Sequence, residues 1–406
     1  MPPRFEPFRG LRYDDSLAPL AVAICPPYDV VDDAERAELA SRSPYNAIHV
    51  ELPIEDPAVP GDRYANAAAL FAEWQRDGAL RRDDAPCLYV YRMTFKDEAG
   101  GARSSTGVIG ALGVDAAGEG SVLPHERTMP KPKGDRLDLL RATAINTSPI
   151  WGLSLADGLT DACTAATGSG PAHMSATDDD GVTHELWAVT DDAAIATISG
   201  LIESTPIVVA DGHHRYETSL FYRQERHDAN GEAAGAEDLV MALVVELTED
   251  ELFVQAIHRL VSGVPEGHDL LADFARFFEI SDGAEDITEL GRQMSRDGGL
   301  GLVYAGRHHL LVPKPIVESE AEAALDSSRL DVALAALGPH NLEYQHGAQI
   351  CAAAVASGRA QAAVLLRPAT VAQIADTAHS GRRMPPKTTF FQPKPRTGMV
   401  FRPVAD

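Results

Sequence analysis

The chain has 406 residues, 45% of them hydrophobic, which is too much apolar material for one small domain. A formal net charge of -25 repels polyanions and argues against DNA or RNA as the main partner. The first residues lack the apolar stretch of a secretory signal, and no apolar run reaches about 20 residues, so we expect no membrane span. The four cysteines form no C-x-x-C pair, so we expect neither disulfides nor a thiolate zinc site. These features together favour a cytoplasmic protein.

The first half of the chain predicts strands separated by helices. An opening strand is expected at residues 23–31, broken by Pro26 and Pro27, with a helix starting near Asp32. An amphipathic helix is expected at residues 63–75. Further strands are expected at residues 86–94, 105–112, 150–155, 185–189 and 206–210, and surface loops at residues 168–181 and 228–237.

The second half continues with apolar runs at residues 239–247 and 252–261 and two strands around a tight turn at residues 301–313. The last elements alternate as helix, strand and helix, at residues 331–337, 360–366 and 371–379. The pattern predicts a mixed α/β (α+β) fold with two lobes, residues 1–235 and 236–406, and a basic tail, residues 382–403, that returns to the first lobe.

Lysines are scarce and clustered. Four of the six fall in two short segments, Lys131 and Lys133 in one and Lys387 and Lys394 in the other. No Asp or Glu occurs between Thr377 and Ala405. In so acidic a chain this local reversal of sign indicates a pocket for a small anion, and the alternative is a solvated basic tail.

The central run Asp211-Gly212-His213-His214-Arg215 follows a buried strand and precedes a helical pattern at residues 216–226, with Leu220 and Phe221 on its inner face. A strand that turns through glycine into a helix leaves backbone N–H groups pointing out of the helix start, which suits an anion. Arg215 can hold a phosphate with two hydrogen bonds, and His213 and His214 add donors that titrate near neutral pH.

Asp211 has three possible roles in this motif, because it can cap the helix, orient an imidazole or bind a divalent cation. The alternative interpretation of the whole run is structural. In that case Asp211 is only a cap and the two histidines are only polar surface residues.

Other motifs carry polar groups of the same kind. His125-Glu126-Arg127-Thr128 precedes Lys131, Lys133, Asp135 and Arg136, a set suited to phosphate or metal binding, or else a loop with ordinary ion pairs. His258 and Arg259 lie in a strand pattern, where alternation points them to opposite faces, so one of them can face the site while His258 can equally make a structural hydrogen bond. Tyr28, Asp29 and Glu51 end early apolar runs, where a catalytic carboxylate or a helix cap can sit.

The Asp-Gly-His-His-Arg run after a strand resembles the signature of the ParB and sulfiredoxin superfamily, and more closely that of its free serine kinases. The wider chain resembles a long bacterial and archaeal family, formerly of unknown function, on patterns that extend from near residue 5 to residue 403. These patterns are Pro26-Pro27-Tyr28-Asp29-Val30, His125-Glu126-Arg127-Thr128, residues 210–217, Ala256-Ile257-His258-Arg259 and residues 384–391. The resemblance implies a ParB/sulfiredoxin-like core and the phosphorylation of free L-serine to O-phosphoserine with pyrophosphate as donor.

Phosphoryl transfer to a hydroxyl needs a base and cations, which constrains the roles. We expect Arg215, His214 and Lys387 to contact phosphate oxygens, and Lys131 or Lys133 to close over the donor. The base is Glu126, Asp29 or Glu51, while Asp211 acts on a histidine or on Mg²⁺, the expected cofactor. The remaining substrate-binding candidates are His125, Arg136, Gly212, His213, His258, Arg259, Thr388 and Lys394.

Neither G-x-x-x-x-G-K-[ST] nor G-x-G-x-x-G occurs, which is compatible with pyrophosphate but leaves ATP or ADP open as donor. Two other functions are alternatives: a ParB-like switch that binds CTP or ATP without transferring phosphate, and a nucleic-acid-binding protein or nuclease, which the acidic charge disfavours. The expected partners are small molecules, L-serine or a related hydroxylated metabolite with its donor, and a homodimer is possible.

Overall fold

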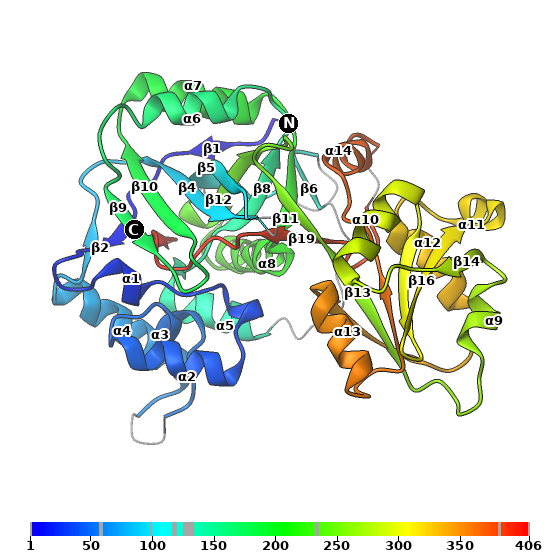
Figure 1. The fold of residues 1–406 in the computed structure, drawn as a ribbon. Coiled ribbons are helices and arrows are strands. Elements are labelled where there is room, and N and C mark those ends of the chain that lie inside the picture. Colours follow the sequence, from blue (N-terminus) through cyan, green and yellow to red (C-terminus); the bar gives the residue numbers. More distant parts are fainter. Residues whose placement is uncertain are drawn as a thin grey trace. The chain divides into compact units, whose positions relative to one another are not determined.

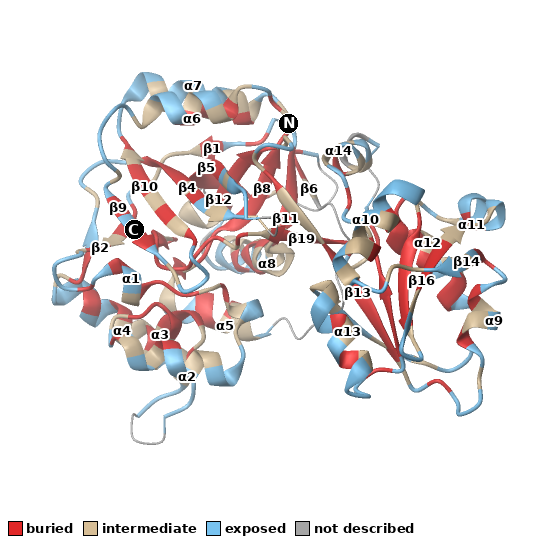
Figure 2. Ribbon diagram, viewed as in Figure 1, coloured by how far each residue is buried: buried red, intermediate tan, exposed pale blue. Residues whose placement is uncertain are grey.

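The structure is a computed structural model and describes residues 2–56, 60–97, 100–115, 120–124, 134–231, 235–380 and 383–404. The chain forms two compact units (Figure 1). The first, unit 1, contains the residues up to Leu252 and the segment from Pro393 onward, and the second, unit 2, is Phe253–Gln392. In each unit the central strands of the sheet are the most buried elements, and many exposed residues lie on helices and loops (Figure 2).

Unit 1 is built on a nine-stranded sheet in which the path runs β6-β11-β8-β12-β5-β4-β10-β9 and β1 pairs with β5. The strands are β1 (Phe5–Glu6), β4 (Leu88–Lys96), β5 (Ala102–Gly113), β6 (Val122–Pro124), β8 (Ile150–Ser154), β9 (Met174–Thr177), β10 (Thr183–Val189), β11 (Ile207–Asp211) and β12 (Leu239–Glu246). Two small ribbons join it: β2 (Leu11–Tyr13) with β3 (Leu80–Arg82), and β7 (Ile145–Asn146) with β20 (Arg402–Pro403).

The helices of unit 1 are α1 (Leu20–Ala23), α2 (Asp33–Arg42), α3 (Ile48–Glu51), α4 (Arg63–Arg76), α5 (Gly134–Thr143), α6 (Leu159–Ala166), α7 (Asp192–Glu203) and α8 (His213–Asn230), with 3-10 turns η1 (Tyr28–Val30) and η2 (Ala236–Asp238). Helices α6 and α7 pack together along one side of the sheet, and α8 lies on the side away from them in the view of Figure 1. The starts of α2 and α4 are capped by Asp32 and Asp62, whose carboxylates each accept two backbone N–H bonds.

Unit 2 has a seven-stranded sheet whose path runs β14-β16-β15-β18-β13-β17, with β19 paired to β13. Its strands are β13 (Phe253–Ser262), β14 (Phe278–Asp282), β15 (Leu300–Tyr304), β16 (Arg307–Pro313), β17 (Asn341–His346), β18 (Ala362–Leu365) and β19 (Thr389–Gln392). Its helices are α9 (Leu270–Phe274), α10 (Ile287–Asp297), α11 (Pro315–Glu320), α12 (Asp326–Ala335), α13 (Ala348–Ala356) and α14 (Val371–His379).

The expected mixed α/β class is confirmed. The division between the units differs from the expected one at residues 235 and 236. The reason is β12, which pairs antiparallel with β5 and parallel with β8 and so belongs to the sheet of unit 1. Within the described ranges, no helix is both long and apolar enough to cross a bilayer.

Several local expectations were wrong. Residues 23–31 form no strand, because Pro26 and Pro27 lack N–H groups; Cys25 makes one bridge to Thr397 and Tyr28–Val30 is a single 3-10 turn. The expected loop at residues 168–181 contains β9, and Phe221, expected on the inner face of its helix, is 45% exposed.

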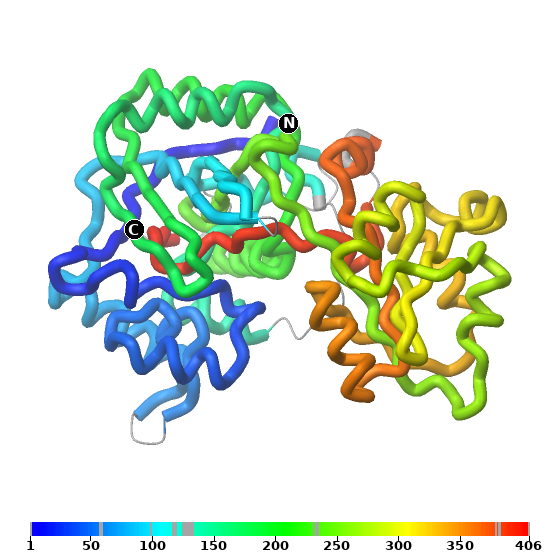
Figure 3. The backbone as a smooth tube through the Cα atoms, viewed as in Figure 1, coloured from blue at the N-terminus to red at the C-terminus, as the bar shows by residue number. Residues whose placement is uncertain are grey.

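The C-terminal segment, residues 393–404, belongs to unit 1 and lies beside the N-terminal residues (Figure 3). Cys25 and Thr397 exchange two backbone hydrogen bonds, as do Leu11 and Phe401. Phe401 is fully buried, and its ring meets that of Phe71 edge-on at 5.1 Å between centroids. The end of the chain therefore completes the core of unit 1.

Candidate functional site

The site is built around the turn between β11 and α8. β11 lies between β6 and β8, and its register with β8 shifts between Val209 and Asp211, a bulge that redirects the Asp211 side chain. Gly212 then has φ +85°, in the left-handed region. A Cβ here would lie 3.1 Å from the Ile150 Cα and 3.1 Å from Arg215 Nε, so the turn needs glycine for both its dihedral angle and its space.

Asp211 is held by two cations. Its Oδ2 lies 3.1 Å from Arg215 Nη2, and its Oδ1 lies 3.2 Å from Lys394 Nζ. Burial acts to raise the pKa of Asp211, but the charges of Lys394 and Arg215 outweigh it and lower that pKa to about 2. Asp211 is therefore an anion that organises Arg215 and Lys394, and both of its oxygens are engaged.

Arg215 continues the chain of contacts toward Glu51. Its Nη1 donates to Ser148 Oγ at 3.1 Å and to the Pro149 carbonyl. The Ser148 hydroxyl in turn donates to Glu51 Oε1 at 3.0 Å. Although burial acts to lower the pKa of Arg215, the negative charges of Asp211 and Asp29 raise it overall, so the guanidinium stays charged.

Glu51, at the end of α3, is fully buried. Its Oε1 accepts from Ser148 and, at 3.4 Å, from the Tyr28 N–H, whereas Oε2 has no hydrogen-bond partner among the described residues. Native proteins rarely leave a buried carboxylate oxygen unsatisfied. Glu51 therefore has one oxygen available for a ligand or a water molecule.

Arg136, near the start of α5, lies beside Glu51. Its Nη1 donates to the Glu51 backbone carbonyl at 2.6 Å, and its Nε donates to Asp135 Oδ2 at 2.7 Å. The guanidinium carbon lies 4.3 Å from the centre of the Tyr28 ring. Burial raises the pKa of Tyr28 to about 12, so its hydroxyl stays protonated at neutral pH.

These groups line a cavity of about 50 Å³, large enough for a water molecule or a small ligand group. Its polar wall is formed by Tyr28, Glu51, Arg136, Ser148 and Arg215, and its apolar wall includes Leu139, Leu140, Ile145 and Val240. The site thus combines a buried carboxylate and two guanidinium groups around one small space.

The two histidines lie at the first turn of α8. His213 acts electrostatically to lower the pKa of Asp211, after the larger effects of Lys394 and Arg215. His214 Nε2 is buried and has no hydrogen-bond partner among the described residues. His214 is therefore the second polar side chain of the site with an unused atom.

The remaining candidates are outside the described residues, next to Tyr28 or in unit 2. His125, Glu126, Lys131 and Lys133 are outside the described residues, and Asp29 is exposed next to Tyr28. In unit 2, His258 is buried and its Nδ1 accepts the Leu366 N–H at 3.1 Å, and Arg259 donates to the Ile257 carbonyl at 2.6 Å.

Lys387 and Thr388 also belong to unit 2. Lys387 is exposed with φ +58°, and the Thr388 hydroxyl donates to the Pro385 carbonyl at 2.8 Å. Phosphate contacts for Lys387, Thr388, His258 and Arg259 stay predictions.

The sequence interpretation missed Ser148, which joins Arg215 to Glu51. The available signal was the polar run Asn146-Thr147-Ser148 directly before Pro149 and the strand at Ile150, because polar residues beside a strand end can meet side chains from a neighbouring strand. It also gave Lys394 less weight than Lys387, although Lys394 is the lysine that contacts Asp211.

Solved structures with some similarity include a mutant of a free serine kinase in complex with AMP, at 14% identity and a TM-score of 0.37, covering 67% of this chain and 83% of that one. A conserved hypothetical protein from Pyrococcus furiosus is 12% identical with a TM-score of 0.34, covering 67% and 87%. C-terminally truncated SbnI from Staphylococcus aureus is 13% identical with a TM-score of 0.36, covering 71% and 85%. These scores are low, and the likeness carries no argument about function.

No curated protein matches the sequence. A family model, described as a protein of unknown function (DUF1015), matches residues 5–333. This match spans most of the chain, which therefore belongs to that family.

Proposed function

We propose that this chain is a phosphotransferase that transfers a phosphoryl group to the hydroxyl of a small metabolite. The observation that carries the proposal is Glu51, a fully buried carboxylate whose Oε2 is unsatisfied among the described residues. Glu51 lines a small cavity together with Arg136 and Arg215. A hydroxyl attacks phosphorus when a base accepts its proton and cations stabilise the charge on the transferred group. The cavity brings both kinds of group together.

In this proposal Glu51 is the base. The acceptor hydroxyl gives its proton to Oε2, its oxygen forms the new bond to phosphorus, and the bond from phosphorus to the donor's leaving phosphate breaks. Ser148 donates to Oε1 and so fixes the carboxylate with Oε2 open. Arg215 and His214 bind the phosphate oxygens at the start of α8, and Arg136 stabilises an anionic group of the acceptor.

Asp211 acts indirectly, because its carboxylate orients Arg215 and Lys394. Among the described residues no group of three or more His, Cys, Asp or Glu can hold a metal ion, and both Asp211 oxygens are engaged by cations. The described side chains therefore do not fit a metal site by themselves. We propose that Mg²⁺ arrives bound to donor phosphate oxygens, since it is usually held by few protein ligands plus phosphates.

L-serine as acceptor and pyrophosphate as donor follow from the family resemblance and are the first pair to test. The hydroxyl of L-serine suits Glu51 and its carboxylate suits Arg136, because both residues line the cavity. We expect purified protein with magnesium to convert L-serine and pyrophosphate into O-phosphoserine and orthophosphate, observed by phosphorus NMR.

The same experiment should include ATP, ADP and CTP as donors and a panel of amino acids and polyols as acceptors. If product forms with a nucleotide but not with pyrophosphate, the proposed donor is wrong and the proposed phosphotransferase activity stands. Nucleotide binding without product would favour a nucleotide-dependent switch. No phosphorylated product from any pair would overturn the proposal.

A further inference from the structure

Lys394 reaches Asp211 from a segment distant in sequence, and its position depends on how that segment is held. Its side chain is only 11% exposed, with Nζ at 3.2 Å from Asp211 Oδ1. It stands between Pro393 and Pro395. Each proline fixes its own φ, and a residue before proline is confined to extended conformations, so the backbone around Lys394 has little freedom of its own. The direction of the side chain is therefore set by the next point at which the segment is anchored.

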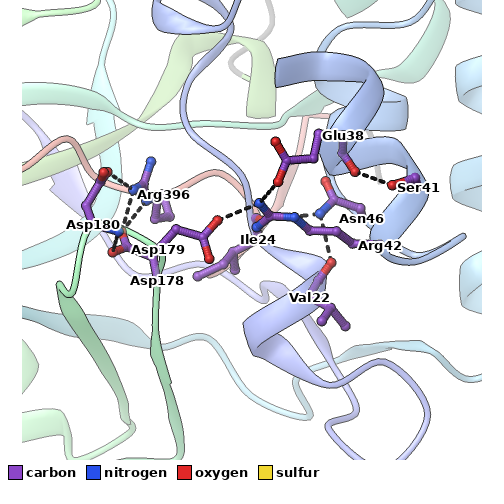
Figure 4. A network of polar contacts seen from close by, with 10 residues as sticks. All are labelled: Val22, Ile24, Glu38, Ser41, Arg42, Asn46, Asp178, Asp179, Asp180 and Arg396. Carbon is purple, nitrogen blue, oxygen red and sulfur yellow. Dashed lines mark hydrogen bonds and ion pairs between the residues drawn. The ribbon is translucent and has the colours of Figure 1, made fainter. Parts of the chain in front are cut away.

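Part of that anchor is the Arg396 side chain, two residues later (Figure 4), and the rest is the backbone pairing of Thr397 with Cys25. The Arg396 Nε donates to Asp178 Oδ2 at 2.7 Å and its Nη2 to Asp180 Oδ2 at 2.8 Å. The guanidinium is 10% exposed, and the Asp178 side chain is 9% exposed. The bond to Asp178 is away from solvent, where a charge-assisted bond is stronger and more directional than a surface ion pair, whereas the Asp180 side chain is exposed.

The acceptor side of this anchor is held by its own hydrogen bonds. Asp178 Oδ1 accepts the N–H groups of Asp180 and Val182, which closes the turn between β9 and β10. The Arg396 N–H donates to the Tyr91 hydroxyl oxygen, so that hydroxyl is left to donate to His184 Nδ1 and His184 Nε2–H to donate to Asp178. Burial lowers the pKa of His184, which agrees with this neutral form.

We propose that Arg396 is a positioning residue that sets Lys394 against the Asp211 carboxylate, using the β9–β10 turn as its fixed point. The consequence for turnover rests on the proposed function, whereas the consequence for Lys394 itself does not. Without the Arg396 side chain, the Pro393-Lys394-Pro395 segment keeps the backbone bonds at Arg396 and Thr397 but loses its ion pairs with Asp178 and Asp180, so Lys394 is held less firmly against Asp211.

The first test measures the chemical reactivity of Lys394. With six lysines in the chain, acetic anhydride labelling followed by peptide mass spectrometry resolves each site, and exposed Lys96 serves as the internal reference. We expect Arg396→Gln to speed acetylation of Lys394 by about tenfold relative to Lys96, because the anchored segment now opens. Arg396→Lys should restore part of the protection.

The matched control is Arg42→Gln. Arg42 pairs with Asp179 in the same turn, at 2.5 Å, and does not touch Arg396 (Figure 4). Like Arg396→Gln, this variant removes one positive charge that pairs with the acidic β9–β10 turn. General loosening of the turn would therefore appear in both variants. We expect wild-type labelling of Lys394 in Arg42→Gln.

The second test is turnover. Arg396→Gln should lower kcat by about tenfold or more, since a displaced charged group is costly at a reacting centre, while Arg42→Gln keeps the wild-type rate. If the wild type has no phosphotransferase activity, the proposed function fails, and the labelling result still decides the role of Arg396.

If Arg396→Gln does not fold, Asp180→Ala replaces it, because the Asp180 side chain is 76% exposed and its truncation removes one of the two acceptors. That variant should speed Lys394 labelling in the same direction, by about threefold. Equal labelling of Lys394 in the wild type and in the folded variant would overturn the proposal.

Discussion

Glu51 and Glu246 are both buried glutamates of unit 1, yet they differ in how their oxygens are used. Glu246 accepts the N–H groups of Gly158 and Thr160 with its two oxygens and so caps α6. Glu51 leaves Oε2 unsatisfied among the described residues. A buried carboxylate with a structural role is expected to have both oxygens hydrogen-bonded, whereas a buried catalytic carboxylate can have an oxygen without a hydrogen-bond partner.

Glu51→Gln removes the proton acceptor and keeps the size of the side chain. We expect turnover to fall by at least about a hundredfold, the usual contribution of a general base, with little loss of stability. Rates with the best donor and acceptor pair, together with thermal unfolding, measure both effects.

Glu246→Gln is the control. Its amide NH₂ would replace one of the two accepting oxygens and would face a backbone N–H at the start of α6, so one hydrogen bond would be lost. The variant should lower the unfolding free energy by about 1–3 kcal/mol and leave turnover near the wild-type value. If Glu51→Gln behaves like Glu246→Gln, with lost stability and full activity, Glu51 is structural.

His258 gives unit 2 a dependence on pH. Burial chiefly, with the nearby charge of Arg259, lowers the pKa of His258 from 6.5 to about 4. The unfolded chain therefore binds a proton below pH 6.5 that the folded unit does not bind, so stability is full above 6.5 and is lost as pH falls toward 4. The loss amounts to roughly 3 kcal/mol.

His258→Asn keeps an acceptor for the Leu366 N–H and removes the titrating ring. We expect its unfolding free energy to change less between pH 7 and pH 4.5 than that of the wild type, and His340→Asn, in the loop before β17, to follow the wild type. All three tryptophans (Trp74, Trp151 and Trp187) lie in unit 1, so tryptophan fluorescence follows the unfolding of unit 1. A calorimetric transition that occurs without a change in this fluorescence therefore reports the unfolding of unit 2. An unchanged pH slope in His258→Asn would contradict the assignment.

At the scale of the element, the backbone conformation of the β11–α8 turn determines where the side chains of the site lie. Gly212 and Gly158 both precede a helix in the left-handed region, with φ of +85° and +86°. They differ in surroundings, because a Cβ at Gly158 meets nothing within 4 Å, whereas one at Gly212 meets the Ile150 backbone and the Arg215 guanidinium.

Gly158→Ala should therefore cost only the dihedral penalty, about 1 kcal/mol, with full activity. Gly212→Ala should cost more, and should also lower turnover because Arg215 must move from Asp211 and Ser148. Urea unfolding followed by tryptophan fluorescence, with rates on the same samples, separates the two variants. Equal stability and activity in both would show that the close approach at Gly212 is unimportant.

At the scale of the whole molecule, the last residues complete the core of unit 1. Phe401 packs among Tyr13 and Phe71, which come from the first part of the chain. Phe401→Ala should lower the unfolding free energy of unit 1 by about 3–5 kcal/mol, because a fully buried aromatic ring leaves a cavity.

Phe221→Ala is the matched control, since that ring is 45% exposed. Its effect should be within about 0.5 kcal/mol, as for most surface substitutions. Tryptophan fluorescence during urea unfolding measures both variants. A small effect of Phe401→Ala would mean that the C-terminal segment is dispensable for unit 1.

Elements defined by local patterns could be predicted from the sequence. The apolar runs at residues 206–210 and 239–247 became β11 and β12, and the amphipathic run at residues 63–75 became α4. Helix α5 was missed because its surroundings contain Pro130 and Pro132, and residues 23–31 were given as a strand although paired prolines cannot donate to a ladder.

The sequence by itself determined the class of the fold, the turn at Gly212 and the chemistry available at Asp211 to Arg215, since these depend on neighbouring residues and on backbone freedom. Only the tertiary structure decided which distant groups meet there. Ser148 and Glu51 reach Arg215, and Lys394 reaches Asp211 across 183 positions of the sequence, the difference between 394 and 211. Sheet pairing and the anchoring of the C-terminal segment bring them together, and both are long-range contacts that leave no periodic signal in the chain.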